Sequence, residues 1–180
     1  MDSELQRRAA AIRLLLMDVD GVLTDGIILN LPGPDGTTYE TKGFNSQDGI
    51  SLQWLVKNGI QTGVMSGRES QATAFRAKQI GMTYIYLGHL EKLPVLYEIC
   101  VKSGLKPENI AYAGDDLVDI PVMRRVGLAF APANARAEVK RAAHFVTSAS
   151  GGAGAVREMV EILLQATGQW PAILKHYEVE

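Results

Sequence analysis

The chain has 180 residues, of which 47% are hydrophobic and 21% are charged, and this size suits one domain over residues 1–180 with a full hydrophobic core. A formal net charge of −2 argues against a surface for nucleic acid or for an anionic membrane. The single cysteine excludes an intrachain disulfide and, with no apolar run long enough to span a bilayer, favours a cytoplasmic protein.

Apolar runs alternate with amphipathic stretches along the chain. Runs typical of buried strands lie at residues 12–18, 60–66, 83–88, 109–115, 127–132 and 144–148. Stretches of helical period lie at residues 47–58, 69–80, 89–104, 117–126, 133–143 and 154–167. This alternation predicts an α/β fold, a doubly wound parallel sheet of the Rossmann-like type with helices on both faces.

Residues 26–45 interrupt the alternation. Two short alternating runs flank a Pro-Gly-Pro-Asp-Gly turn, which predicts a β-hairpin flap inserted after the first strand in place of a cap domain. The tail at residues 168–180 carries Trp170 and Tyr177, and we expect these aromatic side chains to dock on another part of the protein.

The first apolar run ends in two aspartates, Asp18 and Asp20. Because side chains alternate along a strand, both carboxylates leave the strand end on the same side. Two such charges repel each other by roughly 4 kcal/mol at a separation of ~4 Å and an effective dielectric constant near 20. The sequence therefore calls for a cation, a shared proton, or both.

Ligands of an open parallel sheet bind beyond the carboxyl ends of its strands. Three further predicted strands are followed by reactive groups, namely Ser66, Gly67 and Arg68, then Lys92, then Asp115, Asp116 and Asp119. A carboxylate nucleophile, a second acid, N–H donors, a lysine and further acids are what phosphoryl transfer requires, because a phosphate dianion repels an attacking carboxylate. Mg²⁺ suits this set of oxygen ligands.

The order of the motifs DVDGVLTDG, SGR, a lysine and GDDLVDIPVM resembles the haloacid dehalogenase-like phosphatase superfamily. Within it, the hairpin in place of a cap and the segments FNSQDG, SGRES and GGAGAVRE are similar to the 3-deoxy-D-manno-octulosonate 8-phosphate phosphatase family. The resemblance covers nearly the whole chain. It implies Mg²⁺-dependent hydrolysis of that sugar-acid phosphate through an aspartyl-phosphate, as a step in lipopolysaccharide precursor synthesis.

The same resemblance implies a role for each motif residue. Asp18 would attack phosphorus and bind Mg²⁺, while Asp20 would protonate the leaving alkoxide, activate water and lend its backbone carbonyl to the metal. Asp115 would complete the protein ligands. The phosphate would be held by Ser66, Gly67 and Lys92, with Asp116 and Asp119 in support.

For the sugar acid, the family pattern assigns the residues Asn45, Ser46, Gln47, Asp48, Gly49, Arg68 and Arg76. A guanidinium group suits a substrate carboxylate. Gln53 stands where we expect the family to place another arginine, and Arg76 is equally compatible with a solvated helix face.

Two other functions fit parts of the pattern. A phosphatase for a nine-carbon sialic-type acid 9-phosphate shares the scaffold, although Arg68 favours the eight-carbon acid because glutamate is expected there in the nine-carbon group. A receiver-type signalling domain combines similar residues, but its acidic pair comes first in the chain, whereas here it comes last.

The family also implies a homotetramer. Because a capless site is open to water, we expect neighbouring subunits to cover it, with hairpins packing together and the 168–180 tail reaching a partner's site.

Overall fold

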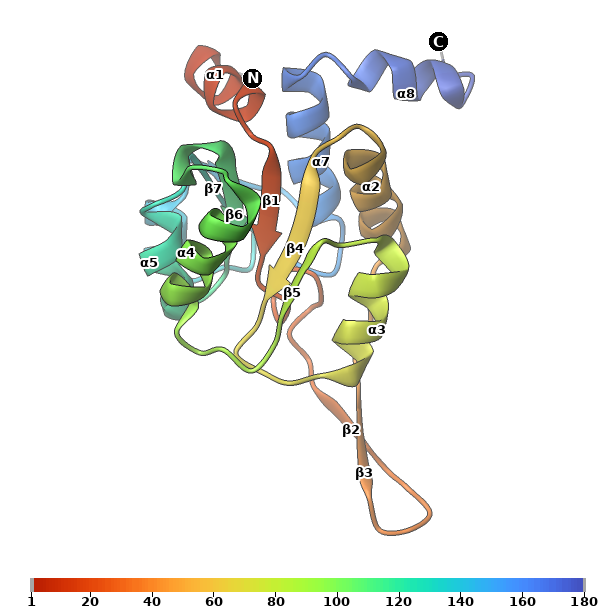
Figure 1. Ribbon diagram of the computed structural model, residues 1–180. Helices are drawn as coiled ribbons and strands as arrows, with labels where there is room; N and C mark the ends of the chain where they lie inside the picture. The colour runs from red at the N-terminus through yellow and green to blue at the C-terminus, as the bar shows by residue number, and fades with distance from the viewer. Residues whose placement is uncertain (1, 180) are drawn as a thin grey trace.

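The computed structural model describes residues 2–179, and its centre is a six-stranded parallel sheet (Figure 1). The strands are β1 (Leu14–Met17), β4 (Gln61–Met65), β5 (Tyr84–Tyr86), β6 (Ile110–Ala113), β7 (Leu128–Ala131) and β8 (Phe145–Val146). Their order is β5-β4-β1-β6-β7-β8, so the chain winds outward from β1 in both directions. This confirms the predicted doubly wound α/β sheet and each of its predicted strands.

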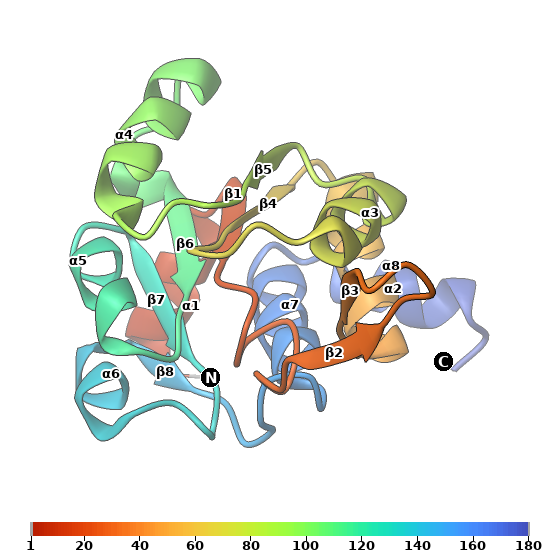
Figure 2. The same cartoon turned by 90° about the horizontal axis from the view of Figure 1, so that it is seen from below.

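Helices cover both faces of the sheet, as Figure 2 shows from the hairpin side. They are α2 (Ser46–Lys57), α3 (Gln71–Ile80), α4 (Lys92–Ser103), α5 (Ile120–Met123), α6 (Ala137–Ala142) and α7 (Ala155–Ala166). Leu15 and Met17 of β1 pack in the core with α2 and α7, while Leu14 and Leu16 pack with α4 and α5. None of the helices between residues 2 and 179 is long and apolar enough to cross a membrane.

Two further helices lie outside the predicted elements. Helix α1 (Ser3–Ala10) is capped by Asp2, whose carboxylate accepts the N–H of Leu5 at 2.8 Å. Leu5 and Ala9, four residues apart, are its buried side chains. Helix α8 (Trp170–His176) forms from the tail and packs near α7.

The predicted flap is an antiparallel hairpin of β2 (Leu29–Pro32) and β3 (Thr38–Thr41). It projects from the end of the sheet toward which β1 and β4 point, whereas α8 lies at the opposite end (Figure 1). Leu31 pairs with Tyr39 across the hairpin, and both side chains are more than half exposed, at 54% and 56%. The hairpin therefore presents apolar surface to its surroundings.

Candidate active site

A cavity of about 300 Å³ lies beyond the carboxyl ends of the strands. It is lined by Asp18, Asp20, Ser66, Gly67, Arg68, Leu90, Lys92, Asp115, Asp116 and Val118. All of these except Leu90 and Val118 are site residues expected from the sequence. The parallel sheet brings them together because the loops after β1, β4, β5 and β6 share one edge.

Asp18 is buried and held by its surroundings. Its N–H donates to the carbonyl of Ala113 in β6 at 2.9 Å, which continues the β1–β6 ladder to the carboxylate. Its Oδ1 lies 2.8 Å from Nζ of Lys92, a buried lysine at the first position of α4. Burial alone lowers the pKa of Lys92, but attraction to Asp18 and Asp119 outweighs this and raises it. Lys92 therefore stays cationic beside Asp18.

Asp119 lies beneath the cavity and supports it. Its Oδ1 accepts hydrogen bonds from Lys92 at 2.7 Å and from the hydroxyl of Tyr112 at 2.6 Å. Its Oδ2 accepts the backbone N–H groups of Asp115 and Asp116 at 3.0 and 3.1 Å. Both oxygens are thus engaged within the protein, so Asp119 orients the lysine and the Asp115–Asp116 loop. Asp116 itself is exposed and accepts the N–H of Leu117.

Asp115 and Asp18 provide the carboxylate oxygens that a cation needs. Asp18, Asp115 and Asp119 each offer an oxygen within 4.8 Å of the others. Burial, followed by the charge of Asp18, raises the pKa of Asp115 to about 7, and burial raises the pKa of Asp18 to about 6. Oδ1 of Asp115 is buried and has no hydrogen-bond partner among residues 2–179. A divalent cation with oxygen ligands fits here, because it satisfies this oxygen and offsets the repulsion.

The loop after β1 passes close to the side chain of Asp115, and the residue at the closest approach is a glycine. Gly21 has φ +95°, and a Cβ at this position would overlap the carboxylate of Asp115. Asn134, which the motifs did not indicate, donates to the carbonyl of Gly21 at 2.9 Å and accepts the N–H of Gly151 at 2.7 Å. A Cβ on Gly151 would overlap that same carbonyl. The glycine-rich segment before α7 therefore serves as close backbone support for the loop that carries Asp20.

The hairpin contributes two charged residues that sequence reasoning missed, Lys42 and Glu40. Nζ of Lys42 lies 2.5 Å from Oδ1 of Asp20 and 3.6 Å from Oε1 of Glu40. Arg68 donates to Oε2 of Glu40 at 2.9 Å, and its Nε is 4.0 Å from Oδ2 of Asp20. The alternation of side chains in β3 was the one sequence signal for this pair, because it places residues 40 and 42 on the same face of the strand. Nothing local showed that this face meets Asp20.

The comparisons with known proteins agree with this geometry. A family model described as haloacid dehalogenase-like hydrolase matches residues 68–159. The 3-deoxy-D-manno-octulosonate 8-phosphate phosphatase of Yersinia pestis is 42% identical over 160 residues, which cover 89% of this chain and 83% of that protein. Its counterpart in Escherichia coli K12 is 39% identical over 169 residues, covering 94% and 88%.

A crystal structure of the phosphatase of the same name from Moraxella catarrhalis, in complex with magnesium ion, phosphate ion and KDO, matches with a TM-score of 0.92. It is 36% identical and covers 98% of this chain and 99% of its own. The chain belongs to the 3-deoxy-D-manno-octulosonate 8-phosphate phosphatase family of haloacid dehalogenase-like hydrolases. It is a phosphoric monoester hydrolase, and this excludes the receiver-domain alternative.

Of the residues that the family pattern assigned to the sugar acid, only Arg68 lines the cavity of Asp18, and the others lie elsewhere. Asn45 caps α2, accepting the N–H groups of Gln47 and Asp48. Asp48 is completely buried, and its Oδ1 accepts the N–H of Arg157 at 2.8 Å. Burial raises the pKa of the Asp48 carboxyl group. The structure thus places its side chain at the start of α7 and away from solvent, where it joins the first turn of α2 to α7.

Arg76 and Ser46 line a separate cavity of about 390 Å³, together with Phe44, Phe75 and other residues of α3. Arg76 is half-buried and donates to Oε1 of Gln79 at 2.6 Å. A Cβ on Gly49 would overlap its guanidinium group. This close approach to α2 distinguishes Arg76 from a fully solvated residue, although it does not line the cavity of Asp18.

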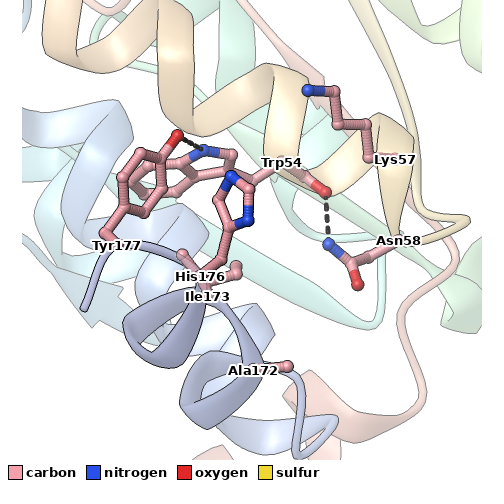
Figure 3. A pocket seen from close by; sticks show the side chains of 7 residues that line it. All are labelled: Trp54, Lys57, Asn58, Ala172, Ile173, His176 and Tyr177. Carbon is pink, nitrogen blue, oxygen red and sulfur yellow. Dashed lines mark hydrogen bonds between the residues drawn. The ribbon is translucent and has the colours of Figure 1, made fainter. Parts of the chain in front are cut away.

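The described part of the tail, residues 168–179, docks on helix α2 of its own chain (Figure 3). Tyr177 accepts the indole N–H of Trp54 at 3.3 Å, and the Trp170 ring lies 6.0 Å from that of Trp54. The guanidinium carbon of Arg157 is 4.2 Å from the centre of the Trp54 ring. A cavity of about 260 Å³ between α2 and α8 borders Trp54 and Tyr177, but it lies apart from the acidic cluster and gathers none of its residues.

Proposed function

We propose that the protein hydrolyses 3-deoxy-D-manno-octulosonate 8-phosphate to the free sugar acid and phosphate. The observation that carries the proposal is the single cavity shared by Asp18, Asp20, Ser66, Lys92 and Asp115 in a member of this family. The complex of the Moraxella catarrhalis relative with magnesium, phosphate and KDO supports the same chemistry.

In this proposal, Asp18, Asp115 and the main-chain carbonyl of Asp20 would hold Mg²⁺. The unpartnered Oδ1 of Asp115 and the all-oxygen donor set suit that ion. When bound, Mg²⁺ offsets the negative charge of both the carboxylates and the phosphate.

In the first step, a carboxylate oxygen of Asp18 attacks phosphorus. The bond from phosphorus to the sugar oxygen breaks, and its electron pair goes to that oxygen, which takes a proton from Asp20. Lys92, Ser66 and the N–H of Gly67 stabilise the negative charge of the transferring phosphoryl group. The products of this step are the free sugar acid and an aspartyl-phosphate.

In the second step, Asp20 takes a proton from a water molecule, whose oxygen attacks phosphorus. The bond from phosphorus to Asp18 breaks, which releases phosphate and restores the Asp18 carboxylate. Asp20 ends protonated and ready for the next substrate. The same side chain thus acts first as an acid and then as a base.

Arg68 is the cation that we assign to the substrate carboxylate, and the sugar site is completed by Arg76 and by residues 45–49, the N-cap and first turn of α2. Asn45, Ser46 and Gln47 would contact the sugar directly, whereas the buried residues Asp48 and Gly49 would support this first turn of α2 from beneath. A nine-carbon acid phosphate remains the alternative substrate. Arg68 favours the eight-carbon acid, and Gln53 is the position at which this chain departs from the expected pattern.

We also propose a homotetramer in a Gram-negative cytoplasm, supplying the free sugar acid for lipopolysaccharide synthesis. The exposed apolar side chains of the hairpin support assembly with other copies of the chain. Helix α8 docks on its own subunit, at the end of the sheet away from the hairpin (Figure 1). The tail up to residue 179 therefore does not cover the site of its own subunit, and we propose that it reaches the site of a neighbouring subunit.

The test is Mg²⁺-dependent phosphate release from the eight-carbon acid phosphate, a nine-carbon acid phosphate and simple sugar phosphates. We expect kcat/KM to favour the eight-carbon acid at least about a hundredfold, which is about 2.7 kcal/mol of differential transition-state binding. Asp18→Asn serves as the inactive blank. Equal turnover of all substrates would refute the substrate assignment and leave the phosphatase chemistry standing.

A further inference from the structure

We propose that Lys42, at the foot of the hairpin, is a positioning residue that holds Asp20 in place as the acid for the leaving alkoxide. The inference rests on the proposed function, because it concerns the proton that Asp20 delivers. Lys42 directly follows β3, so its contact with Asp20 also links the flap to the proposed acid.

The first observation is the burial of Lys42. Its side chain is completely buried, and its ammonium group lies 2.5 Å from Oδ1 of Asp20 and 3.6 Å from Glu40. Lysine is almost never fully buried unless it is paired, because removing an ammonium group from water is costly. These two carboxylates are therefore the reason that the lysine is tolerated here, and Asp20 is the closer of them.

The second observation is the contrast with Arg68. Nε of Arg68 lies 4.0 Å from Oδ2 of Asp20, and its side chain is 51% exposed. A solvent-exposed pair at that separation contributes little to fixing a side chain. Arg68 is also engaged with Glu40 at 2.9 Å. Lys42 is thus the partner that determines the position of the Asp20 carboxyl group.

The geometry gives the two carboxyl oxygens of Asp20 different roles. Oδ1 is occupied by the lysine, which leaves Oδ2 to carry the proton toward the cavity. When Oδ2 passes that proton to the leaving sugar oxygen, Asp20 becomes a carboxylate, and the adjacent ammonium group stabilises the new negative charge. No atom of Lys42 needs to touch the substrate.

The experiment compares two leaving groups in Lys42→Met, which removes the ammonium group and keeps a long apolar side chain. A sugar phosphate releases a basic alkoxide that must be protonated, whereas p-nitrophenyl phosphate releases a stable phenolate that needs no proton. Since kcat/KM reports the steps through release of the leaving group, we expect a loss of about 10–100-fold with the sugar phosphate and less than about threefold with p-nitrophenyl phosphate. Lys42→Gln, which keeps an N–H donor, should show a smaller selective loss.

Two further variants make the result decisive. Lys106→Met, at a side chain that is 78% exposed, should leave both kcat/KM values unchanged. Equal losses with both substrates, or no loss with either, would overturn the inference and leave Lys42 as an anchor of the flap. Asp20→Asn separates the two proposals. If Asp20→Asn shows the leaving-group selectivity and Lys42→Met does not, only the role of Lys42 fails. If Asp20→Asn lacks the selectivity, the acid role of Asp20 and the role of Lys42 both fail, while the substrate assignment is decided by the phosphate-release assay.

Discussion

The ammonium group of Lys92 lies 2.7 Å from Oδ1 of Asp119, which has no exposed surface. Asp119 also accepts the hydroxyl of Tyr112 and two backbone N–H groups, so it connects α4 to the loop that carries Asp115. The catalytic lysine that we propose is therefore fixed from below by a residue that the cavity does not expose.

Replacing Asp119 should destabilise the protein as well as impair it. Asp119→Asn keeps the shape of the side chain but leaves Lys92 with one carboxylate partner, and breaking a buried pair in this way costs about 3–5 kcal/mol. Urea denaturation measures the loss, and phosphate release should fall with it. Asp116→Asn, at an exposed carboxylate, is the matched control. An unfolding free energy within about 0.5 kcal/mol of the parent would contradict this account.

Mg²⁺ should bind more weakly as the pH falls. The ion needs ionised carboxylates, and the pKa of Asp115 in the metal-free protein is raised to about 7, chiefly by burial. We expect the affinity to rise as the pH increases to about 7 and then to level off, with at least about a tenfold difference between pH ~5.5 and pH ~8 by titration calorimetry. An affinity independent of pH over this range would contradict the prediction.

Removing the charge of Asp115 should stabilise the metal-free protein. Its pKa is raised from 3.8 in the unfolded chain to about 7 in the fold, so the fold loses stability as the pH rises between these values. Asp115→Asn removes this penalty. In EDTA at pH ~8 its Tm should exceed that of the parent, whereas added Mg²⁺ should raise only the parent's Tm. A lower Tm for the variant in EDTA would show that Asp115 is not under electrostatic strain.

Gly21→Ala should strongly reduce phosphate release, because the added methyl group displaces the carboxylate of Asp115. That group would overlap the carboxylate of Asp115, and the backbone at φ +95° disfavours any side chain. Gly36→Ala is the matched control, because Gly36 also has a positive φ, of +73°, but no atom of residues 2–179 beyond its two chain neighbours lies within 4 Å of the added carbon. We expect phosphate release to fall more than about a hundredfold in Gly21→Ala, while Gly36→Ala costs only about 1 kcal/mol of stability. Similar activities in the two variants would show that the close approach is unimportant.

The hairpin should control assembly. Leu31 and Tyr39 pair on one exposed face, and a charge there should oppose burial against another copy. If the protein forms the proposed homotetramer, Leu31→Glu is expected to shift it toward a 19.5 kDa monomer in size-exclusion chromatography with light scattering. Thr37→Glu places the same charge at the turn and should not change the mass. A Leu31→Glu protein that remains tetrameric would place the interface elsewhere.

Much of the site could be predicted because it rests on local rules. The run ending at Asp18 is apolar on both faces, and the parallel sheet then brings Ser66, Lys92 and Asp115 to the same edge without further information. Helix α1 was missed because its charged and alanine-rich sequence has only Leu5 and Ala9 on its buried face. Helix α8 was expected only as a docked tail, since its seven residues are too few for a clear period.

The sequence by itself determined the parallel sheet, which strand each candidate site residue follows, and the carboxylates beside the proposed metal. Strand alternation and loop position are local properties of the chain. Only the tertiary structure decided that Lys42 meets Asp20 and that Asp48 is buried under α7. Both contacts join segments far apart in the sequence. At such contacts, the surroundings of a side chain depend on which elements pack together, and the periodicity of a single segment does not predict this packing.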